Sequence, residues 1–277
     1  MWSMRSSCVM FAGFLAVVAS PVLGQVARAP RLPQGLRPVP TEAEIVAALQ
    51  GGDIDSEKSL MLTKASELPA HSLRDSTVSA MSLKVVDLWR QIQRQFEADP
   101  SSRHEGDPDA EYLEALVGVL KNQKNPAGID GLVTVVPYYA TVADIAQFGD
   151  PAVPALVRRV RQPESPGEIG HVNGAMDALE QMLEQPAVRS KLSVSSRALI
   201  RQVAVERMKD FGRPETAWST LAHACYLAVA TGDPQLRRQV SDLVADDVEL
   251  RRRGVADAEK QEWFKKLIGE ALNKKFQ

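Results

Sequence analysis

The chain has 277 residues, of which 44% are hydrophobic and 25% are charged, and its formal net charge is −2. This composition is typical of a folded protein with enough apolar surface to bury a sizeable core. The near-neutral charge argues against the strongly basic face that nucleic-acid binding usually needs, so we expect no nucleic-acid partner.

Residues 1–24 have the pattern of a secretory signal peptide. A single positive charge at Arg5 precedes an apolar run from Cys8 to Ala19, and a tail of mostly small residues ends at Gly24. The run is about twelve residues, which is short for a membrane span, although an uncleaved anchor is an alternative. We therefore expect cleavage after Gly24, a secreted or periplasmic protein, and no transmembrane span in the mature chain.

Residues 25–40 carry four prolines and three arginines, which predicts an extended linker. The fold should begin near Thr41, an N-cap residue with Glu44 at the capping-box position. A short helix then runs to Gln50. An N-terminal helical segment is expected to cover residues 41–98.

Two longer helices are predicted within that segment, at roughly 54–67 and 72–97. The second has one apolar stripe, formed by Val78, Met81, Val85, Leu88, Trp89, Ile92 and Phe96. A polar loop at 98–107 separates this segment from the rest of the chain.

Helical periodicity continues to the C-terminus. The expected ranges are roughly 109–122, 129–148 (broken at Pro137), 152–162, 168–184, 195–210, 215–230, 235–249 and 256–274. The β-branched run 132–136 is compatible with a short strand, but we predict helix because its neighbours are helical. No useful alternating strand pattern occurs elsewhere, so the expected fold class is all-α.

A Gly-Asp-Pro triplet interrupts two of these helices. Gly149 can adopt the left-handed conformation that closes a helix, because it has no Cβ. Asp150 can cap the next helix by accepting hydrogen bonds from its first amides, and Pro151 suits the first helical position. The triplet therefore predicts a helix end and a helix start within three residues.

The triplet recurs at 106–108 and 232–234, which lie 43 residues before and 83 residues after 149–151. The tetrapeptide 185–188 also echoes 150–153 at a separation of 35 residues. Self-similarity at about 35 to 47 residues is the period of two-helix repeats.

The stretch 145–160, IAQFGDPAVPALVRRV, resembles the junction between HEAT-like repeats of the short variety found in phycobilisome lyases. The matching residues are Ile145, Phe148, Gly149, Asp150, Pro151, Ala152, Val153, Pro154, Ala155 and Leu156. The later repeats depart from the pattern, so the array is degenerate. The resemblance implies a right-handed α-solenoid of stacked antiparallel helix pairs, of the HEAT-like or armadillo type, over 106–276. It implies no lyase activity.

The sequence nominates no catalytic or metal site. None of its four histidines stands at metal-ligand spacing from another histidine or a cysteine: His71, His104, His171 and His223. Cys225, two residues after His223, should point to another face of the helix and be a buried, inert thiol. The acidic strings 53–57 and 107–111 start like calcium loops but lack the required glycine, so we interpret them as first turns of helices. We expect no metal and no cofactor.

Basic and aromatic residues near the repeat junctions are the candidates for a partner-binding surface: Arg158, Arg159, Arg161, Arg237, Arg238, Tyr138 and Tyr139. Solvated helix faces and aromatic core positions are the simpler interpretation of these residues. If arginines at corresponding turns align, they would form a surface for an acidic partner or an anionic envelope polymer.

Stacked helix pairs expose one extended surface and lack the closed pocket typical of small-ligand sites. We therefore expect an exported, non-enzymatic scaffold that binds another protein or peptide in the cell envelope or outside the cell. One alternative is a structural or polymer-binding protein that uses the arginines. The other is a hydrolase with a site between repeats, which His171 or His223 exposed beside a carboxylate would favour.

Overall fold

The computed structural model describes residues 38–51, 54–99, 108–138, 141–162, 169–209 and 217–274. All of them lie in the unit Pro38–Gln277, so the predicted signal peptide and most of the predicted linker fall outside the described residues. Within these ranges the structure contains helices and no strand, which confirms the all-α class. None of the described helices has the length and apolarity that crossing a bilayer requires.

The first helices begin close to where the sequence predicts them. Helix α2 (Glu42–Gln50) starts with the expected capping box, in which the Glu44 carboxylate accepts from the Thr41 amide at 2.7 Å. Helices α3 (Ser56–Ala65) and α4 (Asp75–Ala98) follow. The capping box satisfies amides that would otherwise lack a partner at the start of the fold.

Two other predictions for this segment are also confirmed. In the acidic string 53–57, Asp55 caps α3 by accepting from the Lys58 amide at 2.8 Å. Five residues of the α4 stripe are at most 5% exposed: Val78, Met81, Val85, Leu88 and Ile92. Trp89 packs at the edge of the same core, and the side chain of Phe96 lies outside the described residues.

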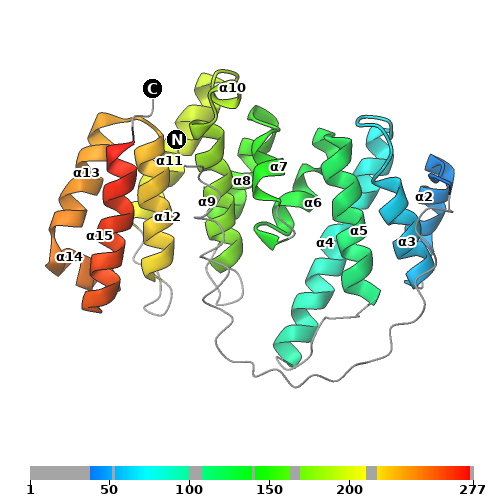
Figure 1. Ribbon diagram of the computed structural model, residues 1–277, viewed down its shortest axis with the longest axis horizontal. Coiled ribbons are helices and arrows are strands. Elements are labelled where there is room, and N and C mark those ends of the chain that lie inside the picture. The colour runs from blue at the N-terminus through cyan, green and yellow to red at the C-terminus, as the bar shows by residue number, and fades with distance from the viewer. Residues whose placement is uncertain are drawn as a thin grey trace. The chain divides into compact units, whose positions relative to one another are not determined.

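The remaining helices are α5 (Pro108–Gln123), η3 (Pro126–Gly128), α6 (Ile129–Thr134), α7 (Val142–Ala146), η5 (Asp150–Ala152), α8 (Val153–Val160), α9 (Ile169–Glu184), α10 (Pro186–Arg189), α11 (Val194–Lys209), α12 (Ala217–Ala230), α13 (Pro234–Ala245), α14 (Asp247–Arg252) and α15 (Ala258–Asn273). Figure 1 shows them in chain order.

Three boundaries differ from the prediction. The helix expected at 129–148 is broken around Pro137 as predicted, but the two parts are shorter than expected: α6 ends at Thr134, α7 covers only Val142–Ala146, and a cis Val136–Pro137 bond lies between them. The helix expected at 235–249 ends at Ala245, because Asp246 has an extended backbone and caps α14 instead. The short helix α10 was not predicted.

The Gly149 triplet makes the predicted turn but not by the predicted contacts. Gly149 has φ +64° and ψ −132°, which is a positive-φ conformation but not the left-handed helical one expected. The Asp150 carboxylate does not cap the helix that follows it. It accepts from the Ser193 amide at 2.8 Å, just before α11, while the turn itself closes as a 3-10 helix through backbone bonds.

The Gly232 triplet behaves as predicted. Gly232 has φ +74°, and the Asp233 carboxylate accepts from the amides of Gln235 at 2.8 Å and Leu236 at 3.1 Å. These bonds hold the pKa of Asp233 below its usual value. The third triplet begins in residues outside the described ranges, and its proline, Pro108, starts α5.

Packing contacts connect two series of helices (Figure 1). In one series α4 contacts α6, α6 contacts α8 and α8 contacts α11. In the other, α7 contacts α9, α9 contacts α12 and α12 contacts α15. Helices α8 and α9 also pack together, as do α11 and α12, so that neighbouring pairs bury one another's apolar sides.

Two arginines 46 residues apart each bond to the C-terminal end of an earlier helix. Arg207, on α11, is 7% exposed and donates to the carbonyls of Val160 at 2.7 Å and Gln162 at 3.1 Å. Arg253, after α14, donates to the carbonyl of Met208 near the end of α11. Each arginine therefore satisfies carbonyls that the end of the preceding helix leaves without an intrahelical partner.

Candidate functional site

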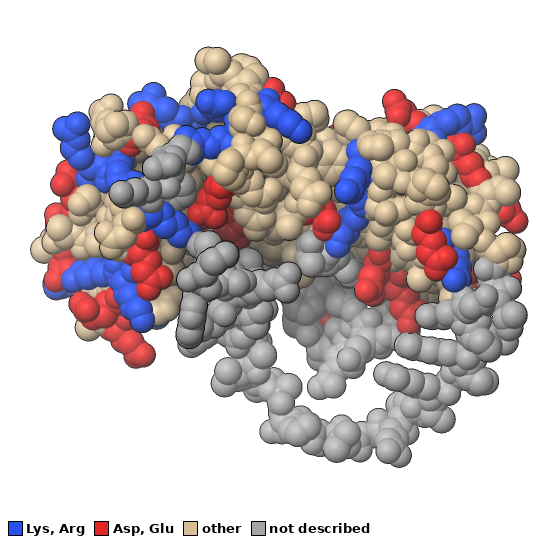
Figure 2. Space-filling view, turned by 45° about the horizontal axis from the view of Figure 1, so that its top comes forward, with Lys and Arg blue, Asp and Glu red and all other residues tan. Residues whose placement is uncertain are grey.

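The arginines predicted to form a partner surface are largely engaged within the protein. Arg158 pairs with Asp130 of α6 at 2.8 Å, and Arg161 makes a two-pronged pair with Glu206 of α11 at 2.8 and 3.0 Å. On the face visible in Figure 2, basic and acidic side chains are interspersed. Such pairs connect neighbouring helices and reduce the positive charge offered to an anionic partner.

The other members of that set are not part of these two ion pairs and differ in their environments. Arg159 is half-buried and bonded to Gln162, Arg237 donates to the Lys274 carbonyl at 3.3 Å, and Arg238 is exposed. Tyr139 lies outside the described residues, whereas Tyr138 is 44% exposed and belongs to an aromatic cluster.

The aromatic cluster consists of Trp89 from α4, Tyr138 and His171 from α9. The ring centroids are 5.2 Å apart for Trp89 and Tyr138, 5.1 Å for Trp89 and His171, and 5.0 Å for Tyr138 and His171. These separations are those of packed aromatic pairs and leave no room for a ligand between the rings. The cluster joins parts of the chain that are more than 80 residues apart in sequence.

His171 is fully buried, and neither ring nitrogen has a hydrogen-bond partner among the described residues. Burial, and then the nearby positive charge of Arg159, lower its pKa to about 4, while the Val136 carbonyl acts weakly in the opposite direction. His171 is therefore neutral at pH 7. Among the described residues it has no carboxylate partner that would orient it as a catalytic base.

A polar seam runs between α9 and α12. Asn173 donates to the Ser219 hydroxyl at 3.4 Å, and Asp177 lies 2.6 Å from Nδ1 of His223. Both contacts join residues 46 positions apart, the same interval that separates the two capping arginines. The side chain of His223 is 12% exposed and that of Asp177 is 32% exposed, so the pair sits at the margin of the interface.

The seam continues towards α15 as a carboxylate-rich contact. Lys274 pairs with Glu184 at 2.9 Å and lies 5.7 Å above the ring of Tyr226. Glu180 lies between Asp177 and Glu184 on α9. Burial, followed by the negative charges of these two neighbours, raises its pKa well above the usual value. The same environment raises the pKa of Tyr226, whose hydroxyl donates to the Leu267 carbonyl at 3.0 Å.

We expect Glu180→Gln to raise the melting temperature at pH 8 and to have much less effect near pH 4. The folded protein holds the Glu180 proton more tightly than the unfolded chain does. Stability is therefore fully present below the unfolded pKa, about 4.5, and is lost as pH rises towards the folded value. Glutamine keeps the neutral shape at every pH. Thermal unfolding of both proteins across this range measures the difference; equal gains at pH 4 and pH 8 would contradict the assignment.

His223 and Asp177 form the arrangement that most resembles catalytic chemistry. A carboxylate on Nδ1 orients an imidazole so that Nε2 can accept a proton, and Ser219 precedes His223 by one helical turn. The described residues contain no cluster of histidine, cysteine and carboxylate groups suited to a metal ion. Cys225 is buried, as predicted, and burial raises the pKa of its thiol to about 12, so it is a poor nucleophile.

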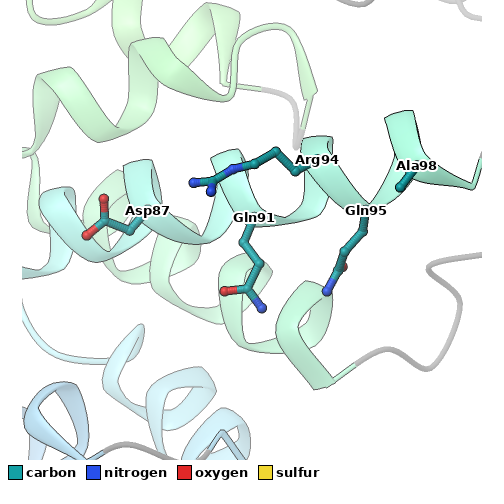
Figure 3. A pocket seen from close by; sticks show the side chains of 5 residues that line it. All are labelled: Asp87, Gln91, Arg94, Gln95 and Ala98. Atoms are coloured by element: carbon teal, nitrogen blue, oxygen red, sulfur yellow. The ribbon is translucent and has the colours of Figure 1, made fainter.

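An open depression of about 470 Å³ lies on α4, well away from this pair. Figure 3 shows its five lining residues on that one helix: Asp87, Gln91, Arg94, Gln95 and Ala98. Gln91 donates to the Asp109 carboxylate at 2.6 Å and so links α4 to α5. The described lining residues all come from one helix, unlike the groups from several elements that converge on a ligand site.

Sequence reasoning missed both the aromatic cluster and the His223–Asp177 pair. For the pair, the available signal was the interval of 46 residues between Asp177 and His223. The chain matches no protein-family model, and no curated protein and no solved structure matches it.

Proposed function

We propose that residues 106–276 form a HEAT-like array of stacked helix pairs, a right-handed solenoid, that binds another protein and catalyses no reaction. The observation that carries this proposal is the regular interval between inter-pair contacts. Arg207 and Arg253 cap the preceding helix at equivalent positions, and Asp177 meets His223 at the same 46-residue spacing. Side chains that repeat in this way support stacked repeat units, which offer an extended surface for a partner.

The proposed partner surface includes the N-terminal halves of α12 and α15. Trp218 and Trp263 pack edge-to-face there, with ring centroids 5.3 Å apart, and Trp263 remains 39% exposed. Tryptophan is the residue type most enriched at positions that dominate binding energy. The pairing of Arg158 and Arg161 with the protein's own carboxylates favours this surface over an arginine-lined face that binds an anionic polymer.

We expect Trp263→Ala to weaken binding to the natural partner by about 30-fold or more, which is about 2 kcal/mol. The partner is first captured by crosslinking the protein to the extracytoplasmic fraction of the cells that make it. The affinity of the purified partner is then measured for the wild type and the variant.

Leu83→Ala is the matched control, because Leu83 is an exposed apolar residue, 66% accessible, on the distant helix α4. Its affinity should stay within about twofold of wild type. Equal losses for the two variants would place the partner elsewhere, and failure to capture any specific partner would count against a scaffold.

Export from the cytoplasm is part of the proposal and rests on the pattern of residues 1–24. If the arginines instead bind an anionic polymer, attachment should fall steeply with salt and depend on Arg237 and Arg238. Tight binding to a protein surface centred on Trp263 should depend far less on salt.

The second candidate function is hydrolysis, and the His223–Asp177 contact of 2.6 Å is the observation that favours it. Labelling of Ser219 by a fluorophosphonate, lost in His223→Gln, would support it. We rank it below the scaffold because His223 is largely buried and the middle of a helix offers no backbone amides to stabilise an oxyanion.

A further inference from the structure

Two ion pairs and the aromatic cluster cross the central junction, between α4–α6 on one side and α7–α9 on the other. Lys121 of α5 pairs with Asp144 of α7 at 2.9 Å. Arg158 of α8 pairs with Asp130 of α6 at 2.8 Å, and both side chains are more than 60% exposed. The third link is the aromatic cluster. The exposed Arg158–Asp130 pair contributes little, and the packing of α6 against α7 and α8 adds buried apolar contacts to these links.

His171 is the acid-sensitive member of that cluster. The groups that act on its charge are the Arg159 guanidinium from α8 and the Val136 carbonyl from the segment after α6. The rings of Trp89 and Tyr138 cover it, and on its own helix Asn173 is buried, with its side-chain oxygen unpartnered among the described residues. An imidazolium here would face the like charge of Arg159, and the described residues around it offer no carboxylate.

Helix α9 packs closely against residues 137–138 next to His171. A Cβ built on Gly174 would lie 2.8 Å from Cβ and the nitrogen of Pro137, and one on Gly170 would lie 3.4 Å from the Tyr138 hydroxyl. Helix α9 is thus in close contact with Pro137 and Tyr138 on both sides of His171. A charged ring can reach water only if α9 separates from that segment or from α4.

We propose that the central junction is an acid-sensitive hinge, at which protonation of His171 separates α9 from Trp89 and Tyr138 while the flanking helices stay folded.

The direction follows from linkage. The closed junction gives His171 a pKa of about 4, whereas an exposed imidazole titrates near 6.5, so the open form binds the proton more tightly. Closure is fully favoured above pH 6.5 and is lost progressively as pH falls towards 4. The ratio of open to closed junction should rise on the order of 100-fold between pH 7 and pH 4.

Hydrogen exchange of the full chain, corrected for intrinsic rates and resolved by mass spectrometry, tests the hinge. Between pH 7 and pH 4, protection should fall in residues 135–138 and in the first turns of α9, while α12 and α15 remain protected. His171→Phe keeps a ring of similar size without a titratable group and should abolish this response. His223→Gln, which removes the other largely buried histidine, should retain it.

The proposal is overturned if His171→Phe opens over the same pH interval as wild type, or if all helices lose protection together. Should His171→Phe fail to fold, the titration of the His171 ring in the wild type, followed by nuclear magnetic resonance, decides the matter. A midpoint near pH 4 that coincides with the change in Trp89 and Tyr138 signals supports the hinge. A midpoint near 6.5, or one without those changes, refutes it.

Discussion

Replacing Gly174 with alanine is expected to destabilise the protein by about 2–4 kcal/mol. The added methyl group would lie 2.8–2.9 Å from three atoms of Pro137, closer than real Cβ contacts come. Neither the proline ring nor the buried backbone of α9 can move aside at low cost, so the helix must shift as a whole. Urea unfolding, followed by far-UV circular dichroism, measures the loss as a lower midpoint with an unchanged slope.

Gly269→Ala provides the matched control for that experiment. Gly269 also lies inside a helix, α15, but no atom lies within 4 Å of the position that its Cβ would take. Alanine should therefore stabilise the protein by about 0.5–1 kcal/mol, because it restricts the unfolded chain and favours the helix. If the two substitutions changed stability in the same direction, the close approach of α9 to Pro137 would be refuted.

Arg207→Met is expected to lower the free energy of unfolding by about 2–4 kcal/mol. Methionine keeps most of the apolar stem but leaves the carbonyls of Val160 and Gln162 without their charged donor. Arg207→Lys should recover little of the loss, because an ammonium group cannot reach both carbonyls with the fixed geometry of a guanidinium. Urea unfolding of both variants gives the comparison.

Arg238→Met is the control for this series, because Arg238 is an exposed arginine on α13. Its effect should stay within about 0.5 kcal/mol. A loss at Arg207 no larger than that at Arg238 would mean that the capping contacts do not stabilise the α8–α11 interface.

Local signals allowed much of the helical structure to be predicted. Thr41 and Glu44 are three residues apart, and Asp233 is followed by the amides that it caps, so short-range chemistry decides both contacts. The α4 stripe is another case, because a 3.6-residue period places its members on one face whatever they pack against.

The predictions failed where a residue distant in sequence binds a polar group that was expected to bond to its own neighbours. Asp150 has the same neighbours in sequence as Asp233, yet its carboxylate bonds to Ser193, 43 residues away. That bond is also the main reason why its pKa lies below the usual value. No local pattern distinguishes the two aspartates, because the choice depends on where the next helix pair lies.

The candidate site could not be predicted from the sequence for the same reason. His223 has no metal-ligand or catalytic spacing along the chain, and its partner Asp177 is recognisable only by the 46-residue interval. His171 looked like an ordinary histidine in a helix, and its significance depends on the rings of Trp89 and Tyr138 that other segments place around it. The 46-residue interval relates Asp177 to His223, but no such interval relates Trp89, Tyr138 and His171.

Both capping arginines lie later in the chain than the helix ends to which they donate. Arg207 caps the C-terminal end of α8, and Arg253 caps the C-terminal end of α11, so each of these two helices depends on a later segment for hydrogen bonds to its carbonyls. Truncation from the C-terminal side should therefore leave carbonyls at the ends of α11 and then of α8 without their arginine donors, and so destabilise the helices that remain. Truncation from the N-terminal side removes only helices that receive these bonds. During synthesis, α8 and α11 would accordingly be less stable until the later helices that carry the capping arginines emerge.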